Sequence, residues 1–60
     1  MNNLIIRKAM FNADLKQWQL ANILGLSEYT LCRKLRVELP EEEQERIVSR
    51  IHKWEREKHE

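Results

Sequence analysis

Sixty residues suffice for one small domain, and the single cysteine, Cys32, excludes an intramolecular disulfide that would stabilise it. No apolar run approaches the roughly 20 residues that cross a bilayer, and the first residues lack the basic-then-apolar order of a signal peptide, so we expect no membrane partner and a cytoplasmic location. His52 and His59 have no further ligand at the spacing of a zinc site, and we expect neither a metal nor another cofactor or small-molecule ligand.

The formal net charge of +1 conceals an uneven distribution. Residues 1–36 carry six basic and two acidic side chains, whereas residues 37–60 carry five basic and eight acidic ones. The first part, at +4, is therefore suited to an anionic partner, and the remainder is at −3. Ordinary scatter of surface charge explains the same numbers, so charge alone leaves the kind of partner open.

Helical spacing accounts for most apolar positions, and no useful stretch alternates with the period of a strand. The first predicted helix runs from about Asn3 to Phe11, with Asn2 or Asn3 as its N-cap and the turn-forming residues 12–14 behind it. Its inward face consists of Ile5, Ile6, Ala9 and Met10.

Two short helices are predicted in the middle of the chain. The first covers about residues 16–24 and ends at Gly25, where a left-handed backbone conformation is wanted. The second covers about residues 28–36, with Ser27 as its N-cap. Leucine and alanine side chains face inward on both helices: Leu20, Ala21, Leu24, Leu31 and Leu35.

A long helix is predicted over about residues 41–58. Pro40 opens it, since a proline lacks an N–H that the first turn would leave unpaired. Its first turn is acidic and its last turn basic, as the helix dipole favours. Its apolar stripe consists of Ile47, Val48, Ile51 and Trp54. We therefore predict an all-α fold: a compact four-helix bundle in a single domain, residues 1–60, with a long C-terminal helix.

The segment from Gln17 to Arg36 has the chemistry of a helix-turn-helix. Ala21 is small where two helices cross closely, Gly25 permits a tight turn, and Leu26 plugs the corner between the helices. In such a motif the second helix projects from the surface of the domain, where it can enter a major groove. The same spacing also suits an ordinary helical hairpin with no DNA to bind.

The pattern Gln17-x-x-Leu20-Ala21-x-x-Leu24-Gly25-Leu26-Ser27-x-x-Thr30-Leu31-x-Arg33 resembles the lambda-repressor-like family, which includes Cro and the phage repressors and is also called XRE. The resemblance covers about residues 3–52. It implies a sequence-specific DNA-binding transcriptional regulator of bacterial phages or mobile elements, a repressor that meets double-stranded DNA in the nucleoid. Lys16 and Asp14 depart from the family pattern, which has a Thr or Ser cap and a glycine there. A single long last helix is a third departure, and it bears on the dimer interface.

The outward face of the third helix is expected to contact DNA bases. By position that face offers Glu28, Tyr29 and Arg33, with Cys32 and Arg36 as further candidates, and phosphate contacts are expected from Gln17, Ser27 and Thr30. The resemblance implies the same role for Gln17, Glu28, Tyr29 and Arg33. Two alternatives stay open: the arginines form a solvated basic face, and Thr30 serves as a packing or capping hydroxyl. Cys32, on the same helix, is interpreted as a small helix residue.

The two tryptophans are harder to place. Trp18 is expected to pack on the flank of the bundle rather than to contact a partner. Trp54 lies one turn beyond the stripe that the first three helices can cover, so we expect it to anchor a homodimer. The alternative is a monomer in which Trp54 folds back onto the first helix near Ile5 or Ile6.

Two other classes of function compete with DNA binding. An enzyme is not expected, because the sequence has no recognisable Ser/His/Asp or Cys/His set and no glycine-rich phosphate loop. The stronger rival is a protein-interaction helix-turn-helix, such as an antitoxin, an anti-repressor or a mobile-element accessory factor. Its binding surface would be the long C-terminal helix.

Overall fold

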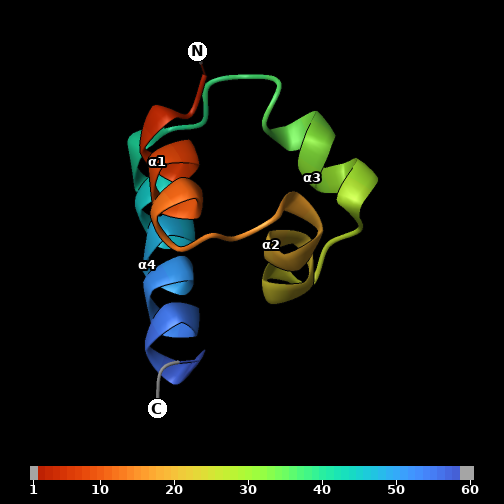
Figure 1. The fold of residues 1–60 in the computed structure, drawn as a ribbon. Helices are drawn as coiled ribbons and strands as arrows, with labels where there is room; N and C mark the ends of the chain where they lie inside the picture. The colour runs from red at the N-terminus through yellow and green to blue at the C-terminus, as the bar shows by residue number, and fades with distance from the viewer. Residues whose placement is uncertain (1, 59–60) are drawn as a thin grey trace.

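The computed structural model describes residues 2–58, and every regular element within them is a helix (Figure 1). The four helices are α1 (Leu4–Asn12), α2 (Gln17–Leu24), α3 (Glu28–Lys34) and α4 (Glu41–Lys58). The predicted all-α fold with four helices and a long last helix is confirmed. The third helix ends at Lys34, two residues earlier than predicted.

The helices form two pairs. Helices α1 and α4 lie side by side, with their N-terminal ends at the same end of the molecule, and α4 continues past the end of α1 (Figure 1). Helices α2 and α3 form the second pair, and α2 also packs against α4. Among the helices, α3 makes close backbone contact only with α2. The helix-turn-helix is therefore attached to the rest of the domain mainly through its first helix.

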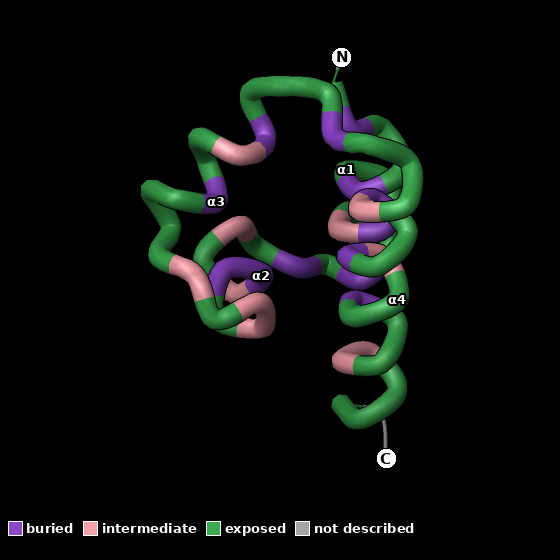
Figure 2. Tube along the Cα trace, turned by 180° about the vertical axis from the view of Figure 1, so that it is seen from behind, coloured by how far each residue is buried: buried purple, intermediate pink, exposed green. Residues whose placement is uncertain are grey.

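Each helix contributes one fully buried apolar side chain to the core between the pairs (Figure 2). These residues are Ile6, Leu20, Leu31 and Ile51. Smaller or flanking positions complete the core: Ala9, Ala13, Leu15, Ala21, Leu35, Leu39 and Ile47. The expectation that Ile5 faces inward is wrong, because its side chain is 43% exposed. It lies about 100° around the helix from Ile6, at the edge of the stripe that α4 covers.

Asn3 stands at the predicted N-cap position of α1, but its side chain does not cap the helix as predicted. Asn3 precedes the helix with a left-handed backbone, φ 58°, and its side chain makes no capping hydrogen bond. Asparagine is among the few residues that adopt this conformation readily. The side chain turns instead toward a segment far along the chain, the linker between α3 and α4.

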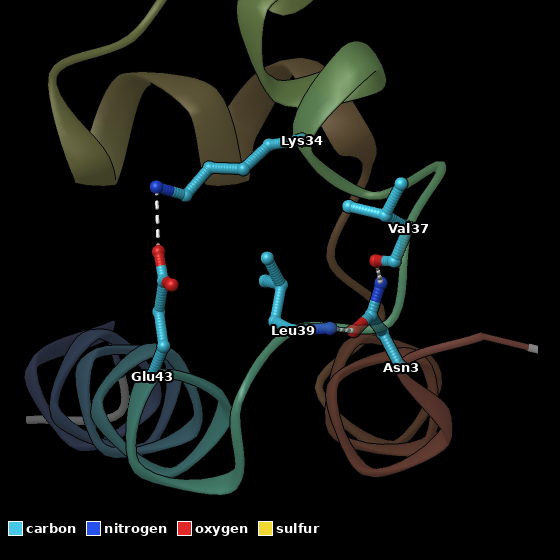
Figure 3. A network of polar contacts seen from close by, with 5 residues as sticks. All are labelled: Asn3, Lys34, Val37, Leu39 and Glu43. Atoms are coloured by element: carbon cyan, nitrogen blue, oxygen red, sulfur yellow. Dashed lines mark hydrogen bonds and ion pairs between the residues drawn. The ribbon is translucent and has the colours of Figure 1, made fainter.

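Asn3 is fully buried and holds that linker in place. Its Nδ2 donates to the carbonyl oxygens of Leu35 at 3.1 Å and Val37 at 2.9 Å. Its Oδ1 accepts from the backbone N–H of Leu39 at 2.8 Å (Figure 3). Both amide hydrogens and the amide oxygen are therefore used, and three backbone groups of the linker are satisfied by one side chain.

Glu38 adds a second connection between the same segments. Its Oε1 accepts from the backbone N–H of Asn3 at 2.6 Å, and its Oε2 accepts from Nε2 of Gln44 at 2.8 Å. The buried Gln44 also donates to the carbonyl oxygen of Leu39 at 2.8 Å. The hydrogen bond from Asn3, followed by that from Gln44, lowers the pKa of the Glu38 carboxyl because both favour its charged form.

Asn3→Ala is expected to lower the free energy of unfolding by about 2–4 kcal/mol, because it leaves the linker groups without partners. Asn3→Asp, which keeps the acceptor and tolerates the left-handed backbone, should lose part of that amount. Asn2→Ala is the matched control: the Asn2 side chain donates only to an exposed carbonyl oxygen, that of Arg36. Its loss should be under about 0.5 kcal/mol. Equal losses in urea unfolding for Asn2→Ala and Asn3→Ala would contradict the role assigned to Asn3.

Glu38→Gln should make stability less sensitive to acid. Because the pKa of Glu38 is lowered by folding, its charged form stabilises the native state above the ordinary glutamate pKa of about 4.3. That contribution is lost as the pH falls through the lower, folded-state pKa. The difference in unfolding free energy between the wild type and Glu38→Gln should therefore be largest at neutral pH and shrink in acid. A difference independent of pH would contradict this.

Candidate nucleic-acid interface

The turn between α2 and α3 is closed by a left-handed glycine, as predicted. Gly25 has φ 71°, and its N–H donates to the carbonyl oxygen of Asn22 at 3.2 Å. The N–H of Leu26 donates to the carbonyl oxygen of Ala21 at 2.8 Å. These two bonds form a Schellman motif, which satisfies carbonyls at the end of α2 and turns the chain sharply toward α3.

The start of α3 is fixed by Ser27, whose predicted role as N-cap is confirmed. Its Oγ accepts from the backbone N–H of Thr30 at 3.1 Å and donates to Oγ1 of Thr30 at 2.8 Å. The alternative that Thr30 is part of the cap is therefore also correct. The two side chains together therefore fix the first turn of α3.

Helix α3 packs on the rest of the domain along one narrow apolar strip, which we call its seam. Leu31 is its only buried residue, and the seam continues to Leu35 just after the helix. The remaining side chains of the first two turns are exposed: Glu28, Tyr29, Thr30, Cys32 and Arg33. Most of the circumference of α3 is thus free to meet a partner.

Two of the predicted DNA contacts lie against each other on that free surface. The guanidinium carbon of Arg33 is 5.8 Å from the centre of the Tyr29 ring, in a cation–π arrangement. The Tyr29 side chain is 68% exposed, so the pair stands in solvent. The two residues are four apart on one face of the helix, and both side chains are exposed there.

Gln17 and Arg36 stand at the ends of the motif. Gln17 is the first residue of α2 and is half-buried, whereas Arg36 follows α3 and is exposed. The structure brings neither of them into a hydrogen bond with Tyr29 or Arg33. The predicted residues therefore form a central group on α3 and two flanking positions.

The cap of α2 comes from within the helix. The backbone N–H of Lys16 donates to Oε1 of Gln19 at 2.8 Å. In a full capping box the side chain of the N-cap residue would also accept from the backbone N–H of Gln19. Lys16 cannot do this, because an ammonium group has no acceptor atom. The expectation that Lys16 caps weakly therefore holds, and Gln19 compensates for it in part.

Two contacts from α4 fix the helix-turn-helix, and sequence analysis did not find either of them. Glu43 forms an ion pair with Lys34 at the end of α3 (Figure 3). Arg50 donates from Nη2 to the carbonyl oxygen of Ile23 at 2.7 Å, near the end of α2. A cation at a helix C-terminus also suits the helix dipole. The basic side chains left for an anionic partner on α3 and behind it are Arg33 and Arg36.

The two tryptophans differ from expectation. The Trp18 side chain is 53% exposed, so the expectation that it packs on the flank of the bundle is wrong for the exposed half of the side chain. Trp54 is half-buried against the core and shares a surface hollow with Ile23 at the end of α2. The ammonium of Lys58 lies 5.0 Å from the centre of its ring. The premise that nothing in the chain covers Trp54 is therefore wrong, because α2 reaches it.

Within residues 2–58 no three His, Cys, Asp or Glu side chains gather as metal ligands would, and His59 lies outside that range. Among the same residues, no helix combines the length and apolarity needed to span a bilayer. The thiol of Cys32 is exposed on α3.

Comparison with protein-family models, curated proteins and solved structures found no match to this chain. A function for this chain therefore has to follow from the motif itself. The features that matter are the fixed turn, the narrow seam of α3 and the exposed group around Tyr29 and Arg33.

The left-handed turn predicts the effect of substitutions at Gly25. A Cβ there would meet no atom within 4 Å, so only the backbone conformation opposes a side chain. Gly25→Ala should lower the free energy of unfolding by about 1–2 kcal/mol. Gly25→Asn should cost less, because asparagine tolerates positive φ. Urea unfolding of both variants measures this, and an alanine variant as stable as the wild type would contradict the turn geometry.

Proposed function

We propose that the protein is a sequence-specific DNA-binding transcriptional regulator of the phage or mobile-element repressor type, which inserts α3 into the major groove of double-stranded DNA. The observation that carries the proposal is the seam of α3. With one buried residue and close backbone contact to α2 alone among the helices, α3 leaves most of its surface exposed beyond a closed turn. A major groove is wide enough for one such helix.

The residues on the exposed surface of α3 suit base recognition. Arg33 offers two parallel N–H donors to O6 and N7 of guanine, and Glu28 offers an acceptor to N4 of cytosine. Tyr29 offers a ring to a thymine methyl group or a hydroxyl to a phosphate. The cation–π contact restricts the motion of Arg33, so less conformational entropy is lost when it binds.

The flanking residues suit phosphate contacts, which fix the position of a protein on the duplex. Gln17 and Arg36 stand at the two ends of the motif. The hydroxyl groups of Ser27 and Thr30 lie 2.8 Å apart, and both residues are exposed at the start of α3. We therefore assign a phosphate role to this pair of hydroxyl groups. The net +4 charge of residues 1–36 supports the approach of a polyanion.

The rival proposal, a protein-interaction module that uses α4, has less support. Protein interfaces are anchored by buried aromatic or aliphatic side chains. The large apolar side chains that are exposed lie elsewhere: Leu4, Ile5, Phe11, Trp18, Tyr29 and Val37. The outward side of α4 is charged. Trp18, half-exposed on α2, is the better anchor if the motif binds a protein.

Selection of bound sequences from random duplexes, followed by sequencing, tests the proposal. We expect an enriched site, and an affinity that falls with salt at a log–log slope of about −0.9 per phosphate neutralised. Retention on heparin should show the same salt dependence. No binding to any duplex at low salt would exclude DNA as the partner.

Substitutions separate base recognition from positioning. Arg33→Ala should cost about 1–3 kcal/mol on the selected site and relax the preference at one base pair. Gln17→Ala should weaken binding to all duplexes alike, because a phosphate contact does not depend on sequence. Arg56→Ala, an exposed arginine in the last turn of α4, is the control and should change neither. Fluorescence anisotropy on selected and scrambled duplexes measures these effects. If Arg33→Ala lost the same affinity on selected and on scrambled duplexes, Arg33 would be a phosphate contact and not a base contact.

A further inference from the structure

A surface hollow of about 270 Å³ lies between the helix-turn-helix and the first three turns of α4. Leu24 and Leu26, from the end of α2 and the turn, line it from one side, and the buried Ile47 of α4 lines it from the other. The two leucines are only partly covered by the core, so they leave apolar surface in the hollow. The hollow is smaller than the roughly 300–1,000 Å³ pockets that hold drug-sized molecules, and it therefore suits a smaller ligand.

The charges around this hollow do not balance. Its lining includes three cations, Lys34, Arg46 and Arg50, and one anion, Glu43, so its net charge is 3 − 1 = +2. Lys34 and Glu43 neutralise each other in an ion pair (Figure 3). Within residues 2–58 no carboxylate forms an ion pair with either arginine. Two uncompensated guanidinium groups thus stand beside the apolar surface.

The two arginines are placed to share one anion. They are four residues apart on α4, where like charges lie close together and repel each other. Arg50 is held in its position because its Nη2 donates to the carbonyl oxygen of Ile23 at 2.7 Å. A single carboxylate between the guanidinium groups would replace their repulsion with two charge-assisted contacts.

We infer that this hollow is a binding site for a small organic carboxylate with a short apolar tail. Its two carboxylate oxygens accept hydrogen bonds from Arg46 and from the N–H groups of Arg50 that are not bound to Ile23. Its tail lies on Leu24 and Leu26. The charged head and the apolar tail are both needed, because the hollow combines a cationic edge with an apolar floor.

A bound carboxylate contacts the turn of the helix-turn-helix and α4 at once. It therefore stabilises the folded chain, by an amount that grows with its concentration. The sequence led us to expect no small-molecule ligand, because the hollow joins segments that are distant along the chain. The inference is independent of the proposed DNA binding, and it is tested without DNA.

Titration of the isotope-labelled full chain with hexanoate tests the inference, with backbone amide shifts followed by nuclear magnetic resonance. We expect saturable shifts at Leu24, Leu26 and residues 46–50, with a dissociation constant of about 1 mM. Acetate, which lacks the tail, and hexylammonium, which has the opposite charge, should each bind at least about tenfold more weakly. These comparisons use the wild type alone, so they do not depend on the folding of a variant.

Substitution of the free arginine tests the site directly. Arg46→Gln should raise the dissociation constant for hexanoate about tenfold, because it removes one charge-assisted contact. Arg56→Gln, an exposed arginine in the last turn of α4 and outside the hollow, is the matched control and should bind as the wild type does. The inference would be overturned by any of three results: no saturable shift with hexanoate, equal binding of hexylammonium, or an unchanged dissociation constant for Arg46→Gln.

Discussion

The architecture depends on one buried asparagine. Asn3 binds three backbone groups of the linker between α3 and α4, and so fixes the start of α4 beside the start of α1. Removing its amide from water is compensated only because each of its polar atoms has a partner. A 60-residue chain without a disulfide has little other means of fixing a long connection. From this fixed start, α4 runs alongside α1 and continues to the end of α2.

The orientation of the helix-turn-helix follows from the position of α4. Glu43, in the first turn of α4, pairs with Lys34 at the end of α3, and Arg50, two turns later, binds the carbonyl of Ile23 in α2. The two helices of the motif are therefore held at their C-terminal ends, while the N-terminal half of α3 remains exposed. A rigid support behind a free surface is what a helix needs if it is to present side chains to a groove without losing order on binding.

Sequence alone predicted the features that depend on local chemistry. Gly25 at the turn, Ser27 as a cap, Pro40 before α4 and the apolar spacing of the helices all act over a few residues, and the structure agrees with them. Contacts between distant residues were missed. The bonds of Asn3 span more than 30 positions, and its polarity suggested a helix cap instead. Ile5 and Trp54 were misjudged for the same reason, because exposure depends on which helix lies opposite. The DNA-contacting role of α3 remains a proposal based on exposure and residue type.

The most direct test of that role is to follow backbone amide shifts of isotope-labelled protein by nuclear magnetic resonance as a selected duplex is added. The proposal predicts that the largest changes fall on residues 28–36 and on Gln17, and that amides on the outward side of α4 change little. Changes concentrated on α4, with residues 28–36 unaffected, would contradict the claim that α3 reads DNA.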